Sequence, residues 1–176
     1  MTISLYDMSV ESFVPMLRAL SGVLDKGAEH ARANKTDPRD LAISQLAPDM
    51  FPLVMQVQIA CDHANRTIAS LTGREPPQFE MTEKRIDDLK QRIQSTIAFI
   101  EGTQEKAFAG ADARKIEIPG PPGMRFTFTG HQLLRDWALP HFYFHVVTAY
   151  DILRHKGVPI GKRDYLSNVG KYLGSA

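Results

Sequence analysis

The sequence predicts an all-α protein, a four-helix bundle with a β-hairpin inserted before its last long helix. Two observations lead to this prediction: four long segments repeat apolar residues at steps of three and four, and one short segment alternates polar and apolar residues. Four amphipathic helices bury their apolar stripes most simply against one another. A length of 176 residues is usual for one domain, so we expect residues 1–176 to form a single bundle domain.

The first helix is predicted to begin at Ser9, as its N-cap, and to end near Asn34. Pro15 fits this helix poorly because proline has no backbone donor, so we expect a loose first turn or a start near Pro15. Residues 36–46 are then predicted to form a connector with one short turn at Pro38. The apolar stripe of the first helix consists of Val10, Phe13, Leu17, Leu20, Leu24, Ala28 and Ala31.

The second helix is predicted to begin near Asp49 and to run to Leu71, with Gly73 as its stop. A loop at 74–77 follows, and Thr82 is expected to cap the third helix. That helix ends between Gly102 and Gly110. The stripes of these two helices are Val54, Val57, Cys61, Ala64, Ile68 and Leu71, and Ile86, Leu89, Ile93, Ile97 and Ile100.

Residues 114–129 alternate polar and apolar side chains around a run of prolines and glycines, which predicts a β-hairpin with a wide turn. A two-stranded hairpin is marginal alone, so one face should pack on the bundle. The last long helix is predicted to run from about Gly130 to His155, with a kink or restart at Pro140. Residues 161–176 are predicted to add a short helix. The packing face of the hairpin consists of Ile116, Ile118, Phe126 and Phe128.

Charge and composition exclude several classes of partner. The chain has 21 basic and 20 acidic residues, a net charge of +1, so nothing favours nucleic acid or an anionic membrane as a partner. Residues 41–60 form the longest nearly uncharged run, and Asp49 and two prolines interrupt it, so we expect no membrane span. An acidic Asp7 near the start and a single cysteine favour a cytoplasmic location.

Two histidines of the last helix, His141 and His145, form the best candidate site. At about 100° per residue they lie at the centre of the face that should be buried, and two imidazoles four residues apart can bind one divalent metal. A helix restart at Pro140 would place His141 in a first turn, where the helix dipole favours neutral imidazole, the form that binds metal. The alternative is a pair of core histidines satisfied by hydrogen bonds.

A third ligand would have to come from another helix, and His63 is the candidate. It lies roughly 115° from the centre of its helix's stripe, on a shoulder beside Gln56 and Thr67. Cys61, at the centre of that stripe, is expected to be a small core residue instead. The sequence contains no phosphate loop, dinucleotide fingerprint, nucleophile elbow or paired-cysteine metal site, and no residue is assigned as a general base.

Several strings in the sequence resemble a family of bacterial proteins classed as a domain of unknown function, placed near the DinB/YfiT-like superfamily of metal-dependent enzymes. The resemblance covers nearly the whole chain. The strings are LAPDMFPL (46–53), QVQIACDH (56–63), LPHFYFH (139–145), AYDILRHKG (149–157) and GKRDYL (161–166).

The resemblance implies a DinB-like four-helix bundle and a homodimer. It also implies that His63, His141 and His145 surround a divalent metal, because in that superfamily a histidine of the second helix joins a pair on the last helix. Characterised relatives resemble thiol-dependent transferases or isomerases. The chain departs from the usual motif by having Val146-Val147 after the second histidine of the pair and by its hairpin.

Two functions from different classes follow. The first is a metal-dependent thiol transferase or hydrolase, in which His63, His141 and His145 bind Zn, Ni or Fe and leave open positions for a small-molecule substrate or thiol. The second is a non-catalytic bundle that binds a small apolar ligand or dimerises, with the histidines as core groups.

Overall fold

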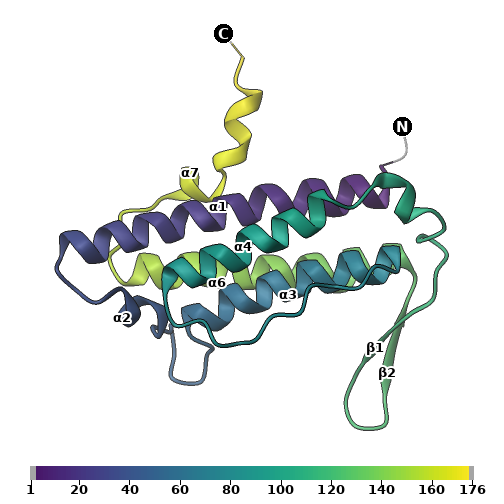
Figure 1. The fold of residues 1–176 in the computed structure, drawn as a ribbon, viewed down its shortest axis with the longest axis horizontal. Helices are drawn as coiled ribbons and strands as arrows, with labels where there is room; N and C mark the ends of the chain where they lie inside the picture. The colour runs from purple at the N-terminus through teal and green to yellow at the C-terminus, as the bar shows by residue number, and fades with distance from the viewer. Residues whose placement is uncertain (1–2, 175–176) are drawn as a thin grey trace.

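The computed structural model of the chain describes residues 3–174, and within that range four long helices pack side by side as a bundle (Figure 1). The prediction of a mostly helical bundle with a small hairpin is therefore confirmed. The bundle helices are α1 (Leu5–Ala33), α3 (Leu53–Thr72), α4 (Ile86–Glu101) and α6 (Leu139–His155).

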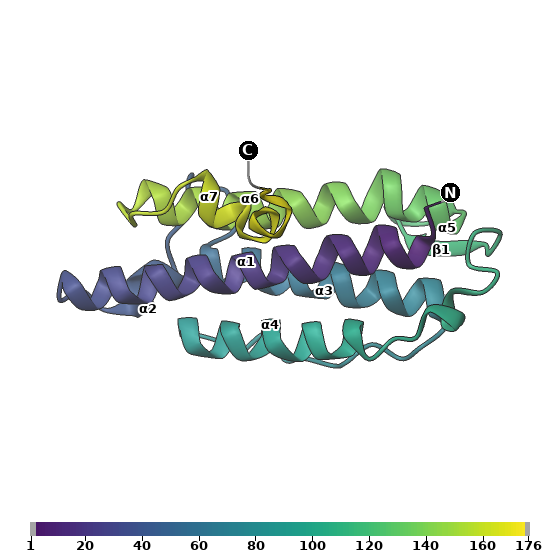
Figure 2. The same ribbon diagram turned by 90° about the horizontal axis from the view of Figure 1, so that it is seen from above.

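The helices run in two directions, as their cross-contacts show. Arg18 of α1 reaches Glu101 at the end of α4, and Asp25, later in α1, reaches Lys90 near the start of α4, so these helices are antiparallel. Gln56 near the start of α3 reaches His145, whereas His63, two turns later in α3, lies against His141, which precedes His145 in α6, so this pair is antiparallel too. In contrast, α3 and α4 run parallel and are joined by a long connector that returns along the bundle (Figures 1 and 2). This arrangement makes the α3–α6 interface the one that positions the histidines.

Helix α1 begins earlier than predicted. Ser4, not Ser9, is its N-cap: Asp7 N–H donates to Ser4 Oγ at 3.0 Å, and Ser4 N–H donates to the Asp7 carboxylate. Ser9 lies buried inside the helix and its hydroxyl donates to the Leu5 carbonyl. Pro15 is also inside the helix, because the buried apolar face extends well upstream of it and outweighs the one lost backbone bond.

The predicted starts of α3 and α4, in contrast, were too early. Asp49 lies in a turn and α3 begins only after Pro52, while its end at Gly73 is as predicted, with φ of 76° in the left-handed region. Thr82 is exposed and belongs to the connector, and Arg85 precedes the first turn of α4. The short helix α2 (Pro38–Ala42), capped by Asp37, confirms the predicted turn at Pro38.

The connector between α3 and α4 is held by a buried ion pair. Arg92 of α4, 4% exposed, binds the Glu83 carboxylate, which also accepts from Gln58 of α3 at 2.8 Å. The Arg92 guanidinium also stacks on the Phe79 ring at 4.6 Å. These contacts explain why Thr82 does not cap a helix: the chain around it is drawn along the bundle in extended form.

The hairpin is present, with β1 (Ile116–Pro119) antiparallel to β2 (Arg125–Phe128) and Ile116 opposite Phe128. The predicted apolar face packs on the bundle at its base, where Ile116 is buried and Phe128 half-buried. Farther along, Phe126 packs against Trp137, with ring centroids 5.0 Å apart, but stays 40% exposed, so the predicted face is only partly covered there. The reason is that the hairpin extends away from the helices towards its tip (Figure 1).

A distorted helical segment leads into α6. After the short helix α5 (Gly130–Gln132), residues Leu133–Ala138 form the π-helical segment η2, and regular α-helix begins at Leu139. Leu139 N–H donates to the Leu134 carbonyl, five residues back, as in a π-turn. Pro140 therefore lies in the first turn of α6, where its missing donor costs least, as the predicted restart requires.

Three further short segments complete the described part of the chain. A 3₁₀ turn, η1 (Glu105–Phe108), follows α4, and α7 (Lys162–Tyr165) and the 3₁₀ helix η3 (Ser167–Tyr172) follow α6. In Figure 1 the chain after α7 stands away from the bundle. Among residues 3–174, no helix has the length and apolar character needed to cross a membrane.

Candidate functional site

Three histidine rings meet at the interface between α3 and α6. The His63 ring lies parallel to that of His141, with ring centroids 4.8 Å apart and an interplanar angle of 4°. The centroid of His145 lies 5.9 Å from that of His63, at an angle of 19°. Because α3 and α6 are antiparallel, His63 sits opposite both members of the pair. The third partner that the sequence suggested is therefore next to the other two.

Burial differs among the three rings. His145 is buried, with 8% of the residue exposed, while His63 and His141 are half-buried. The prediction that both helix-α6 histidines lie at the centre of the buried face is right for His145 and wrong for His141. His141 turns toward the shoulder of α3 that presents His63, at the edge of the interface, so one side of the group is accessible from solvent.

The ring of His141 is oriented by the helix turn before it. Its Nδ1 lies 2.8 Å from the Trp137 carbonyl oxygen. A carbonyl can only accept, so Nδ1 carries the proton and a neutral His141 has its lone pair on Nε2. Trp137 belongs to the π-helical segment η2, and its indole also packs against His141, with centroids 4.3 Å apart.

The ring of His145 is oriented by Gln56, a buried residue of α3 that is only 1% exposed. Gln56 Nε2 donates to the Phe51 carbonyl at 2.9 Å, which leaves its Oε1 to accept from His145 Nδ1 at 2.7 Å. This orientation of the amide again places the imidazole proton on Nδ1 and the lone pair on Nε2. His141 and His145 thus present the same nitrogen.

The surroundings keep the imidazoles of His63 and His145 neutral. Burial, with smaller contributions from the neighbouring His141 and His145, lowers the pKa of His63 from 6.5 to about 4. Burial likewise lowers the pKa of His145 to about 4, with a smaller contribution from His141. Neutral imidazole is the form that binds a metal ion or accepts a proton.

The donor set suits a divalent metal in its chemistry and spacing. At a metal–nitrogen distance of about 2.1 Å, two imidazoles in tetrahedral arrangement have centroids about 5 Å apart, close to the observed 4.8 and 5.9 Å. Metal-binding histidines typically donate a hydrogen bond from the ring nitrogen that does not bind the metal, as Nδ1 does in His141 and His145.

The orientation of His63 does not yet match a metal site. Rings stacked in parallel, as those of His63 and His141 are, cannot both aim a lone pair at one ion. Among residues 3–174, no three His, Cys, Asp or Glu side chains are arranged so that they could bind one metal ion without moving. Metal binding therefore requires His63 to turn about its Cβ–Cγ bond, a torsion with a broad energy profile.

Sequence reasoning missed the roles of Gln56 and Trp137. The signal for Gln56 was available, since it precedes His63 by two helical turns and shares its shoulder of α3. The contact of Trp137 with His141 follows the ordinary spacing of four residues. The interpretation of Cys61 as a core residue agrees with the structure: it is fully buried, and burial raises the pKa of its thiol to about 12.

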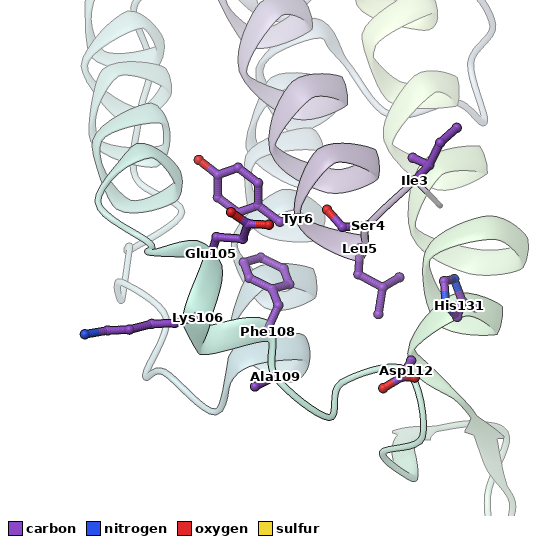
Figure 3. A pocket seen from close by; sticks show the side chains of 10 residues that line it. All are labelled: Ile3, Ser4, Leu5, Tyr6, Glu105, Lys106, Phe108, Ala109, Asp112 and His131. Atoms are coloured by element: carbon purple, nitrogen blue, oxygen red, sulfur yellow. The ribbon is translucent and has the colours of Figure 1, made fainter. Parts of the chain in front are cut away.

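A separate pocket of about 560 Å³ lies at the end of the bundle, between the start of α1 and η1 (Figure 3). Tyr6 and Phe108 form part of its wall, with their rings edge to face at 5.6 Å. In Figure 3 the Lys106 side chain points away from the pocket, and Glu105 lies across it from His131. Its polar groups do not converge, so the histidine group remains the better candidate site.

Comparisons with known proteins identify relatives over nearly the whole chain. The family described as "Domain of unknown function (DUF1993)" matches residues 5–166. Among solved structures, the crystal structure of a DinB family member protein from Shewanella denitrificans is 42% identical in sequence. The alignment covers 92% of this chain and 91% of that chain, with a TM-score of 0.83. Among curated proteins, no sequence matches significantly.

Proposed function

This chain belongs to the DUF1993 family, a family of unknown function related to DinB proteins, and from its histidine group we propose that it binds a divalent metal through His63, His141 and His145. We further propose that the metal serves a thiol-transfer or hydrolytic reaction on a small molecule. Zn, Ni and Fe are among the metals that imidazole donors suit.

The observation that supports this proposal is the fixed protonation pattern of two of the rings. The Trp137 carbonyl and the Gln56 amide oxygen each accept a hydrogen bond from Nδ1–H of one α6 histidine, so both Nε2 atoms are left as donors to a metal, with the His63 ring near both. Core histidines need hydrogen bonds too, but two rings with the same nitrogen free beside a third imidazole match the pattern of a metal centre.

In this proposal the residues of the chain bind and orient. His145 and His141 hold fixed positions, and His63, half-buried, completes the set by turning its ring. A bound divalent ion with an open position would supply a Lewis acid that activates a thiol or a water molecule. The accessible side at His63 and His141 is where a substrate would approach.

A second function has its own supporting observation. The parallel stacking of His63 on His141, together with the hydrogen bonds of His141 and His145, also describes a satisfied polar cluster in a non-catalytic bundle. Such a bundle would bind an apolar ligand or a second copy without metal. In that case replacing a histidine lowers stability and changes no metal content.

Metal analysis of protein purified without a histidine tag tests the proposal. We expect about one equivalent of Zn, Ni or Fe per chain, or uptake of one equivalent from solution, and loss of that uptake in His145→Ala. His131→Ala is the matched control, because His131 is exposed and lies outside the group. Less than about a tenth of an equivalent, with no uptake on adding metal, would refute the proposal.

Thermal melts distinguish the two functions. A ligand that binds only the folded state raises Tm, so added Zn²⁺ or Ni²⁺ should raise that of the wild type and of His131→Ala but not that of His145→Ala. Unchanged Tm values in all three, with His145→Ala less stable than wild type, favour the non-catalytic bundle.

A further inference from the structure

The rings beside the histidine group continue onto the hairpin. Trp137 contacts both His141 and Phe126, with the Phe126 and Trp137 centroids 5.0 Å apart. Phe128 lies 5.9 Å from Trp137 and 6.1 Å from Phe126. We refer to Phe126, Phe128 and Trp137 as the aromatic wall. It connects an exposed part of the hairpin to the edge of the proposed metal site.

The two faces of the hairpin differ in chemistry. Phe126 and Phe128 alternate with Arg125 and Thr127, so they share one face of the strands. On the opposite face Glu117 pairs with both Arg125 and Lys115. The charged side is thus kept in solvent, and the aromatic side is the one that turns toward Trp137.

Packing alone does not account for this wall. A hairpin side chain that served only the core would be covered, as Ile116 at the base is, yet Phe126 is 40% exposed while it touches two other rings. An exposed aromatic ring has a free face that can take a further flat group.

The size of the wall indicates what it binds. The exposed part of Phe126 is on the order of 100 Å², whereas a stable protein interface needs about 800 Å² from each partner. A single aromatic ring or similar flat apolar group is of the right size. Because Trp137 contacts both Phe126 and His141, such a group would lie one ring away from the histidines.

We propose that the aromatic wall sets the substrate specificity of the histidine site, which therefore takes small molecules that join a metal-binding group to an aromatic or other flat apolar group. This inference rests on the proposed metal site. It assigns the hairpin to substrate binding, with Phe126 and Trp137 as specificity-determining residues.

Two hydroxamates that differ by one ring test this inference. Acetohydroxamate and benzohydroxamate carry the same chelating group, so on metal-loaded protein their affinities differ only through the methyl or phenyl group. We expect benzohydroxamate to bind at least about tenfold more tightly, since its ring is removed from water against the wall. Trp137 is the only tryptophan of the chain, so its fluorescence reports binding next to the wall.

Variants of the hairpin locate the effect. In Phe126→Ala the preference for benzohydroxamate should fall to about threefold or less, with acetohydroxamate affinity unchanged. Met124→Ala is the matched control, because Met124 is an exposed apolar residue of the same hairpin, outside the wall, and its removal should leave the preference intact. Circular dichroism of each variant checks that the bundle is folded.

The outcomes separate the two proposals. If metal binds and both hydroxamates bind equally well, or if Phe126→Ala keeps the preference, the role of the wall is refuted and the metal site stands. If a metal titration in the same experiment shows no uptake, the metal site is refuted, and the specificity that rests on it is refuted as well.

Discussion

At the scale of single residues, hydrogen-bond acceptors decide which nitrogen each imidazole presents. The Trp137 carbonyl and the Gln56 amide oxygen both accept from Nδ1, so His141 and His145 are prepared in the same tautomer. Gln56 can do this because Phe51 holds the other end of its amide. A helix wheel places Gln56 and His63 on one shoulder, but only the packing of α3 on α6 reveals that the amide reaches His145.

Gln56→Ala should weaken metal binding by about 10- to 100-fold, because His145 loses the partner that fixes its ring. The measurement is titration calorimetry with Zn²⁺ on untagged protein. Gln58→Ala is the matched control: Gln58 is equally buried on α3 but binds Glu83, away from the histidines. Equal loss of affinity in the two variants would show that the effect is general destabilisation of α3.

The stability of the metal-free protein should fall as the pH is lowered from 6.5 to 4. His63 and His145 have pKa values of about 4 in the folded chain against 6.5 ordinarily. In that interval the unfolded chain binds protons that the folded chain does not, so the contribution to stability is full above pH 6.5 and is lost on the way down. Thermal melts in a chelating buffer measure this slope.

The double variant His63→Gln, His145→Gln provides the comparison for the pH series. It removes both depressed groups, so its Tm should decline less steeply than that of the wild type over the same interval. Parallel curves for the two proteins would mean that the imidazoles are not held neutral by their surroundings.

At the scale of elements, the ends of helices were predicted better than their starts. Gly73 after α3 is visible in the sequence because few other residues adopt a left-handed conformation. The starts of α1 and α4 depend instead on competition between several polar residues. Ser4 and Ser9 are equally good caps in isolation, and burial of the first turn of α1 selects Ser4.

Gly130 is required where the hairpin joins α5, and Gly130→Ala should destabilise the protein by about 1–3 kcal/mol or more. An added Cβ would overlap the Ala111 carbonyl and come within 3.0 Å of the Leu5 side chain. Gly22→Ala in α1 is the control: it meets nothing within 4 Å and should stabilise the helix by about 0.5–1 kcal/mol. Urea denaturation measures both, and a neutral Gly130→Ala would contradict this packing.

At the scale of the whole molecule, the periodicity of apolar residues was sufficient to predict the bundle. It did not predict the direction in which each helix runs. That α3 and α4 run parallel depends on a connector anchored by the pair Glu83 and Arg92, and the apolar pattern of α4 does not reveal that Arg92 binds Glu83. The antiparallel packing of α3 on α6 then brings His63 to the pair on α6. The sequence alone left the place of His63 ambiguous, because a shoulder position becomes an interface only when the neighbouring helix is known.

X-ray absorption at the edge of the bound metal tests the central claim, that His63, His141 and His145 act together as ligands. For the zinc-loaded wild type we predict three imidazole nitrogens at about 2.0–2.1 Å, and two in His63→Ala. A spectrum with oxygen ligands and fewer than two imidazoles, or one that is unchanged in His63→Ala, would contradict the claim.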